Sequence, residues 1–148
     1  MDAMQAMLTR KSVKKYKPPP VEKELVEKII EAGLNAPSGL NKQSPIILAV
    51  TNKELRDELS RLNAGDDPFF RADPFYGAPC VLVVLADKSV PTRVYDGSLV
   101  MENMLLAAHA LGLGACWIHR ARETFERPEG KAILKKLGIE GEYEGIGN

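Results

Sequence analysis

The sequence predicts an α+β fold in which helices flank a central mixed β-sheet around a buried central helix. Short apolar runs at 46–50 and 79–86 are rich in valine, leucine and isoleucine, which is typical of buried strands. The segment 21–37 combines charged residues with apolar residues every three or four positions, as amphipathic helices do. A longer segment, 91–113, is apolar nearly all round and predicts the central helix.

The elements of the N-terminal half follow from periodicity and turn residues. Residues 2–9 predict a short helix, and the three prolines at 18–20 then predict an extended turn because proline fixes φ. The amphipathic helix is expected to end at Pro37, before the polar loop SGLNKQSP. Further along, the charged segment 53–62 predicts a helix, and the loop 63–77 carries three phenylalanines and one tyrosine.

The C-terminal half contains the segments expected to form the core. The strand at 79–86 lacks the alternation of a sheet with a solvent-exposed face, so we expect both of its faces to be covered. Gly112 and Gly114 end the central helix, and ACWI predicts a short strand directly after them. EGKAILKKLGI predicts a last amphipathic helix. The chain has 148 residues and no linker or repeat, so we expect one domain over 1–148.

Composition disfavours several classes of function. Lysine plus arginine and aspartate plus glutamate both number 20, so no overall charge favours nucleic acid or an acidic membrane surface. Cys80 and Cys116 lie in apolar runs as small buried residues, which is typical of a reducing cytoplasm. No apolar run is long enough to span a membrane. His109 and His119 are isolated, and no spacing suggests a metal site.

The first of three candidate binding segments is basic. It combines a guanidinium, ammonium groups and a hydroxyl, the donors that recognise a phosphate. In an extended segment, Arg10, Ser12 and Lys14 would project to one side, with Lys11 and Lys15 between or beyond them. Taken alone, the segment is explained better by a solvated basic turn.

The other two candidate segments are loops rich in small residues. In APSGLNKQSP, Ser38 and Asn41 offer polar groups and Gly39 permits close approach of a ligand, but a helix-terminating turn is the simpler explanation. In LGLGACWI, glycines at a junction between helix and strand would let a planar ligand approach the backbone. Ordinary helix caps explain these glycines equally simply.

Taken together and in this order, the segments resemble the nitroreductase family of FMN-dependent oxidoreductases. The resemblance rests on RKSVKKY, EAGLNAPSGLNKQSP, APCVLVVL and DGSLVMENMLLAAHALGLGACWI, and it covers nearly the whole chain from about Leu8 onward. Each motif alone is weak evidence, whereas three in the family's order and spacing are strong evidence. The resemblance implies an α+β sandwich, an intertwined homodimer and FMN at the subunit interface.

The resemblance also implies roles for individual residues. Arg10 and Ser12 would hold the phosphate and ribityl chain of FMN with help from Lys11, and Lys14 would approach the pyrimidine edge of the ring. At that edge, the cation would stabilise the anionic reduced flavin. Because the cofactor carries the chemistry in this family, no catalytic side chain is expected. Two further sets match the loop that reaches FMN from the partner subunit and the segment that lies against the ring: Pro37, Ser38, Gly39 and Asn41, and then Gly114, Ala115 and Cys116.

The implied function is the reduction of nitroaromatics, quinones or similar small electrophiles by NADH or NADPH, in a ping-pong reaction through FMN. The alternative is a non-catalytic flavin-binding or storage module on the same fold. The aromatic loop 69–76, with Phe69, Phe70, Phe75 and Tyr76, is either a substrate lid or a loop pinned by buried phenylalanines.

Two departures from the family's pattern bear on these expectations. Family members commonly read Asn-x-Gln-Pro-Trp where this chain reads NKQSP, so Ser44 and Pro45 leave the pocket wall without a tryptophan. Relatives usually continue through a further strand and a tail with a basic residue, whereas this sequence ends at EYEGIGN. We expect residues 145–148 to be the approach to that strand. Without the strand and tail, swapping of segments between the subunits of a dimer and the affinity for FMN are both expected to be weaker.

Overall fold

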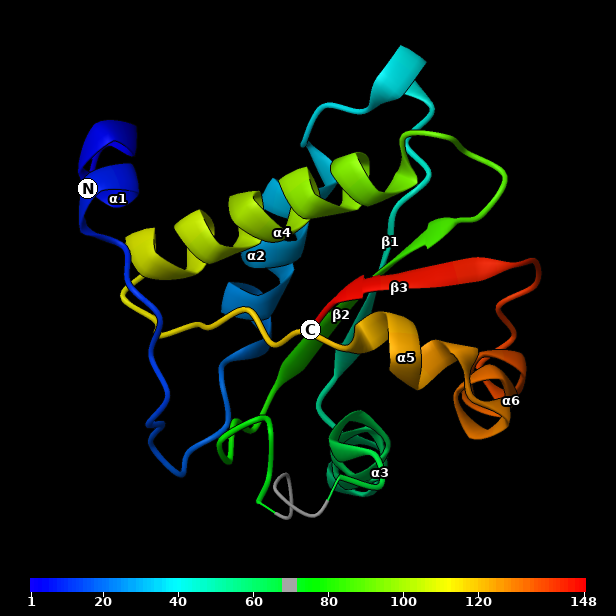
Figure 1. Cartoon of the computed structure of the whole chain (residues 1–148). Helices are drawn as coiled ribbons and strands as arrows, with labels where there is room; N and C mark the ends of the chain where they lie inside the picture. The colour runs from blue at the N-terminus through cyan, green and yellow to red at the C-terminus, as the bar shows by residue number, and fades with distance from the viewer. Residues whose placement is uncertain (68–71) are drawn as a thin grey trace.

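The computed structural model describes residues 1–67 and 72–148 (Figure 1). Its helices are α1 (Ala3–Thr9), α2 (Lys23–Leu34), α3 (Lys53–Ala64), α4 (Arg93–Ala110), α5 (Ala121–Glu126) and α6 (Pro128–Lys136), with a 3-10 turn, η1, at Gly39–Asn41. Its strands are β1 (Ile46–Val50), β2 (Val81–Asp87) and β3 (Tyr143–Gly147). Within the described residues, no helix is both long and apolar enough to cross a membrane.

The strands form one sheet in the order β1-β2-β3, with β2 in the centre. Ile46 lies opposite Leu85 and Val50 opposite Val81, so β1 and β2 are antiparallel. The pairing of β2 with β3 is antiparallel as well. All neighbouring strands are therefore antiparallel, and the prediction of a mixed sheet is wrong for these three strands. Each connection starts the next strand at the same end of the sheet where the previous strand stopped. Parallel pairing in the described residues is confined to one bridge outside these strands.

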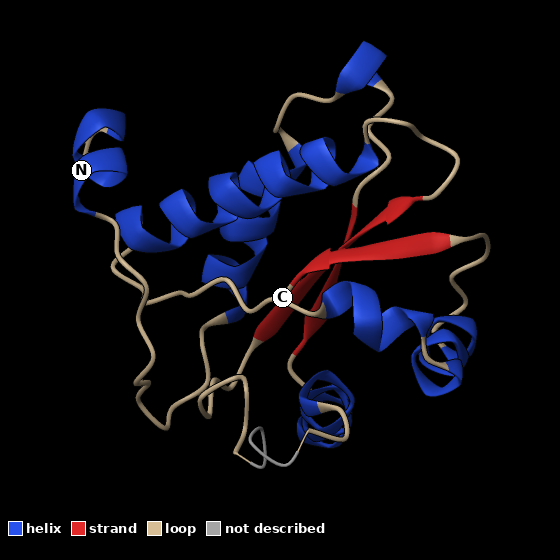
Figure 2. Cartoon of the chain, viewed as in Figure 1, coloured by secondary structure: helices blue, strands red, loops and turns tan. Residues whose placement is uncertain are grey.

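Both faces of the sheet are covered by helices, which confirms the prediction for the second strand (Figure 2). Along β2, Val83 and Leu85 face the cluster formed with α3, α5 and α6, whereas Val84 and Ala86 face α2 and α4. All four residues have a relative exposure of 0%. The strand can be apolar without interruption because neither of its faces meets water.

The helix α4 differs from the fully buried helix that the sequence predicted. Val100, Met104 and Ala108 are buried against the sheet and α2. On its other side, Tyr95 and Leu99 are exposed, at 73% and 44%. A helix on the surface of a sandwich can bury only the stripe that faces inward, so the outer apolar residues have no cover within one chain.

Three further differences lie in the C-terminal third. ACWI was expected to be a strand, but only Ala115 makes a bridge, and Ile118 exchanges backbone hydrogen bonds of 2.9 and 3.0 Å with Asn148. Residues 145–148 were expected only as the approach to a strand, but Tyr143–Gly147 form the strand β3. The short helix α5 was not predicted. It follows Arg120, which has a left-handed φ of 76°. Local periodicity does not predict such a residue or the helix after it.

Candidate functional site

The fold brings together two of the three segments that the sequence singled out. Ser12 and Ala115 form a parallel β-bridge, and the Val13 amide donates a hydrogen bond of 3.0 Å to the Ala115 carbonyl. A Cβ on Gly114 would lie 2.7 Å from Val13 Cγ1, so glycine is required for the two segments to approach this closely. The basic segment and the glycine segment therefore form one continuous surface beyond the C-terminal end of α4.

Exposed and partly buried side chains follow one another along the basic segment. Ser12 and Lys14 are exposed, whereas Val13 and Tyr16 are partly buried on the inner side. Lys11 is exposed as well. The hydroxyl of Ser12 and the ammonium of Lys14 are thus presented to solvent beside the backbone of Gly114.

Arg10 lies at the start of the same surface and is oriented by α4. Its side chain is 29% exposed, and Arg10 Nε lies 3.9 Å from Glu102 Oε1. Directly before it, Thr9 Oγ1 lies 2.8 Å from His109 Nε2, which attaches α1 to the last turns of α4. The weak contact with Glu102 leaves the guanidinium able to bind an anion.

Tyr16 connects the inner side of this surface to its neighbours. Its hydroxyl donates a hydrogen bond of 2.6 Å to the Val13 carbonyl. Burial raises the pKa of the Tyr16 phenol above its ordinary value, and the nearby Cys116 and Tyr76 raise this pKa further. Lys14 Nζ lies 5.4 Å from the centre of the Tyr76 ring, a cation–π contact. Tyr76 therefore borders the site from a third segment of the chain.

The loop Pro37–Asn41 lies at the opposite end of α4. The Gly39 amide donates a hydrogen bond of 2.9 Å to Asp96 Oδ1, and Thr92 Oγ1 donates one of 2.7 Å to Asp96 Oδ2. Since α4 has 18 residues, its two ends are about 27 Å apart. Within one chain, the structure therefore does not bring Pro37, Ser38, Gly39 and Asn41 to the basic segment.

The loop has an unusual backbone in addition to its ordinary role as a turn. Ser38 Oγ accepts a hydrogen bond of 2.9 Å from the Gln43 amide, so Ser38 does satisfy a backbone group. Leu40, Asn41 and Gln43 all have positive φ, between 51° and 53°. Left-handed residues other than glycine are strained, and such strain concentrates at functional sites. Leu40 is 93% exposed, which leaves the tip of the loop available to another molecule.

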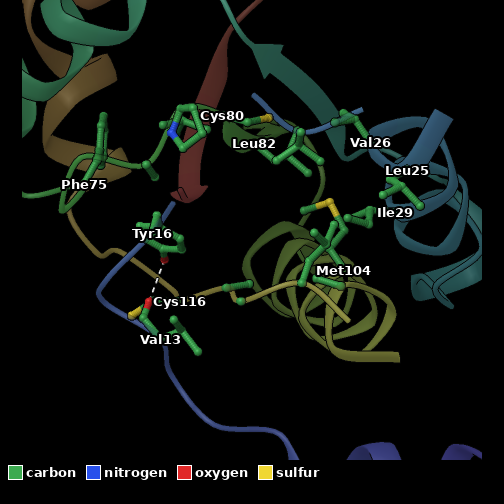
Figure 3. A pocket seen from close by; sticks show the side chains of 18 of the residues that line it. Val13, Tyr16, Leu25, Val26, Ile29, Phe75, Cys80, Leu82, Met104 and Cys116 are labelled. Carbon is green, nitrogen blue, oxygen red and sulfur yellow. Dashed lines mark hydrogen bonds between the residues drawn. The ribbon is translucent and has the colours of Figure 1, made fainter. Parts of the chain in front are cut away.

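A cavity of about 520 Å³ lies beneath the joined segments (Figure 3). Its lining is mostly apolar and includes Tyr16, Cys80, Leu82, Met104 and Cys116. Burial raises the pKa of the Cys80 thiol above its ordinary value. Gly114, Ala115 and Cys116, the predicted ring-contact segment, also line this cavity.

Phe75 and Tyr76, the aromatic residues of the loop 69–76 that the structure describes, differ in exposure. Phe69 and Phe70 lie outside the described residues. Phe75 is 3% exposed and belongs to the core, so it pins the loop, whereas Tyr76 is 45% exposed. No group of three or more potential metal ligands occurs in the part of the chain that the structure describes.

The donor set at the C-terminal end of α4 fits the phosphate and the ring of FMN. An exposed hydroxyl, an exposed ammonium and a partly exposed guanidinium follow one another, and the glycine backbone beside them is open to a planar group. A model of the nitroreductase family matches residues 7–146. The chain belongs to the nitroreductase family. The prediction of the family from the sequence is thereby confirmed.

Individual nitroreductase relatives share about a third of the residues. A protein of Methanothermobacter thermautotrophicus assigned as an NADH dehydrogenase/NAD(P)H nitroreductase is 32% identical over 126 residues, which are 79% of this chain and 60% of that protein. An NADPH-flavin oxidoreductase of Vibrio harveyi is 28% identical over 90% of this chain and 62% of its own length. The chain thus spans about three fifths of these curated relatives.

Solved nitroreductase structures confirm the predicted α+β fold. A nitroreductase with bound FMN from Bacteroides fragilis superposes with a TM-score of 0.90 at 28% identity, over 99% of this chain and 85% of that one. One with bound FMN from Desulfitobacterium hafniense has a TM-score of 0.86 at 27% identity, over 99% and 86% of the two chains.

Sequence reasoning missed several residues that shape the site. Asp96 was overlooked although a carboxylate inside an otherwise apolar helix is a signal of a buried polar role. Tyr16 was read only as part of the basic segment, although an aromatic residue among lysines indicates the inward side of a strand-like segment. Glu102, the partner of Arg10, carries no signal because exposed glutamates on helices are common.

Proposed function

We propose that residues 1–148 form an FMN-dependent oxidoreductase that takes electrons from NADH or NADPH. The acceptors are nitroaromatics, quinones or similar small electrophiles, and donor and acceptor take turns in a ping-pong reaction. The observation that supports this proposal most strongly is the bridge between Ser12 and Ala115. It joins the anion-binding side chains to a flat, glycine-containing backbone, which is the combination that a flavin phosphate and ring require.

The chain's own residues would bind and orient the cofactor. The Arg10 guanidinium and the Ser12 hydroxyl would donate hydrogen bonds to the phosphate and ribityl oxygens, and Lys11 would add positive charge. Lys14 would place an ammonium near the pyrimidine edge, where it would stabilise negative charge. Gly114 to Cys116 would form the wall behind the ring. Bound FMN supplies the hydride and electron transfer, and the protein supplies position and charge.

The exposed apolar residues support a homodimer. Met4, Met7 and Leu8 on α1 and Tyr95 and Leu99 on α4 are all more than two fifths exposed. Exposed apolar side chains in such number are typical of an interface. If two α4 helices pack antiparallel about a two-fold axis, the N-terminal end of one lies beside the C-terminal end of the other. This arrangement brings the loop Pro37–Asn41 of one chain to the basic segment of its partner.

The test is anaerobic reduction of the purified, FMN-loaded protein. We expect NADH or NADPH to bleach the flavin absorption, and menadione to restore it. Arg10→Ala should lower the affinity for FMN by about 10- to 100-fold because it removes charge-assisted hydrogen bonds. Lys136→Ala, an exposed cation in the last turn of α6, is the matched control and should leave FMN binding unchanged.

Two outcomes would count against the proposal in different ways. A protein that binds FMN but is bleached by neither NADH nor NADPH would be the flavin-binding or storage module. A protein that shows no bound flavin spectrum at saturating FMN would refute the site itself. The expected cytoplasmic location stays a prediction.

A further inference from the structure

The turn at Asp73–Ala78 is held to α3 by a hydrogen-bond network. Asp73 is its centre and forms an ion pair with Arg56 Nη2. Asp73 also accepts hydrogen bonds of 2.7 to 3.0 Å from the Ser60 hydroxyl and from the amides of Phe75 and Gly77. Arg56 itself is only 9% exposed. A turn with this many partners is preorganised, so its side chains keep one position.

Tyr76, inside this turn, has a backbone and an exposure that folding alone does not explain. Its φ is 53°, in the left-handed region that favours glycine or asparagine. Its ring is nevertheless 45% exposed, whereas the adjacent Phe75 is buried in the core. The strained backbone at Tyr76 therefore holds an aromatic side chain exposed to solvent. Strain that the surrounding contacts enforce is typical of functional positions.

The Tyr76 ring lies beside the two segments that form the candidate cofactor site. Lys14 Nζ, on the basic segment, is 5.4 Å from the ring centre. Tyr16, which follows on the same segment, is within electrostatic reach of both Tyr76 and Cys116. A ring in this position borders the place where the pyrimidine edge of a flavin and a second planar molecule would meet.

We propose that Tyr76 positions the electron acceptor, a planar aromatic molecule such as a quinone or nitroaromatic, by stacking against its ring. This inference rests on the proposed function and adds to it a residue that selects the acceptor. Tyr76 takes no part in electron transfer, and it contributes binding and orientation only. The Lys14 ammonium contacts the Tyr76 ring, and the exposure of Tyr76 leaves surface for the acceptor.

The experiment compares two acceptors of different shape in the FMN-loaded protein. Steady-state rates are measured at saturating NADH or NADPH with menadione, which is planar and aromatic, and with ferricyanide, which is neither. For Tyr76→Ala we expect the KM for menadione to rise about five- to tenfold with kcat nearly unchanged, since stacking is lost equally from ground and transition states. The constants for ferricyanide should not change.

Two matched variants separate stacking from other roles. Tyr76→Phe keeps the ring and should retain the low KM for menadione. Leu137→Ala removes an exposed side chain of similar exposure at the end of α6 and should affect neither acceptor. If Tyr76→Ala does not fold, Tyr76→Asn takes its place, because asparagine tolerates the left-handed backbone.

The inference is overturned if Tyr76→Ala leaves the KM for menadione unchanged. It is also overturned if the substitution raises the KM for menadione and the KM for ferricyanide by the same factor. Failure of the proposed function would look different. A wild-type protein that binds FMN but is not bleached by NADH or NADPH refutes the reductase. In that case, calorimetric titration of menadione into FMN-loaded wild type and Tyr76→Ala decides the inference, and equal affinities would overturn it.

Discussion

The two ends of α4 are built in opposite ways. At the C-terminal end, Ser12 and Lys14 are exposed and lie on a backbone bridge that leaves their polar groups free for a ligand. At the N-terminal end, Asp96 is 3% exposed and its two carboxylate oxygens already accept hydrogen bonds from Gly39 and Thr92. One end is therefore suited to bind an anion, and the other is suited to hold a loop in place.

This difference indicates how a complete site can arise from a chain that carries its parts far apart. The rigid N-terminal end presents the strained tip of η1 outward, and the C-terminal end presents cations outward. Two copies related by a two-fold axis would bring each tip to the other copy's cations. Variants at each end, alone and mixed, test whether the two ends have these separate roles.

Mixing two defective variants should restore FMN binding. Arg10→Ala damages the cationic end and Asn41→Ala damages the loop, so each homodimer has two defective sites. In a heterodimer of the two, one site carries both defects and the other carries neither. At an FMN concentration where each variant alone is nearly empty, the refolded mixture should recover about a quarter of the wild-type bound flavin, because half of the dimers are mixed.

The control for this experiment mixes two variants with defects at the same end. Arg10→Ala and Lys14→Ala leave one defect in every site, so their mixture should recover nothing. Recovery in both mixtures, or in neither, would contradict a site shared between two chains. Bound flavin is measured by fluorescence after gel filtration.

Removing the carboxylate at the N-terminal end should destabilise the fold. Asp96→Ala deletes the acceptor for the Gly39 amide and the Thr92 hydroxyl, which lie in a partly buried environment. We expect the free energy of unfolding in urea to fall by about 2–3 kcal/mol, the usual loss for hydrogen bonds to a charged group. Asp96→Asn keeps one acceptor oxygen and should lose clearly less. Equal stability of the two variants would show that these hydrogen bonds do not hold the loop.

The network that presents Tyr76 should weaken in acid. Partial burial would raise the pKa of Asp73, but hydrogen bonds from Arg56, Ser60 and two backbone amides outweigh it and lower the pKa from 3.8 to about 2. A lowered pKa in the folded state means that the carboxylate adds stability above about pH 4, and that this stability is lost as the pH falls toward 2. Because Asp73 is partly exposed, we expect about 1 kcal/mol.

Urea unfolding at pH 6 and near pH 2 checks this prediction. Asp73→Asn cannot ionise, so its deficit relative to wild type should shrink by about 1 kcal/mol on acidification. A deficit that stays constant over this range would show that the charge of Asp73 does not support the turn.

Periodicity identified most of the elements, and its failures have local causes. The strand β2 was predictable because an uninterrupted apolar run of β-branched residues has few alternatives. ACWI is equally apolar but only four residues long, and its backbone partners, Ser12 and Asn148, lie far away in the sequence. A segment this short adopts whatever conformation those partners impose.

The candidate site shows the same limit. The residue types of the basic segment indicated anion binding, and the inward position of Val13 could be expected from its place between Ser12 and Lys14. The contact between Lys14 and Tyr76 could not be expected, because it depends on the turn that Asp73 and Arg56 fix. The sequence likewise could not show that Tyr95 and Leu99 lie uncovered, since apolar residues look alike whether their cover comes from the same chain or from another.

The fold class, the places of the main helices and strands, and the chemistry of the basic segment could be predicted from the sequence, because these depend on local periodicity and on residue type. The three-dimensional arrangement was needed to show that this segment joins Gly114–Cys116, that the loop Pro37–Asn41 lies at the far end of α4, and that Tyr76 borders the site. Those relations depend on contacts between segments that are distant along the chain. They depend also on the length of α4, whose 18 residues keep the loop at one end apart from the basic segment at the other.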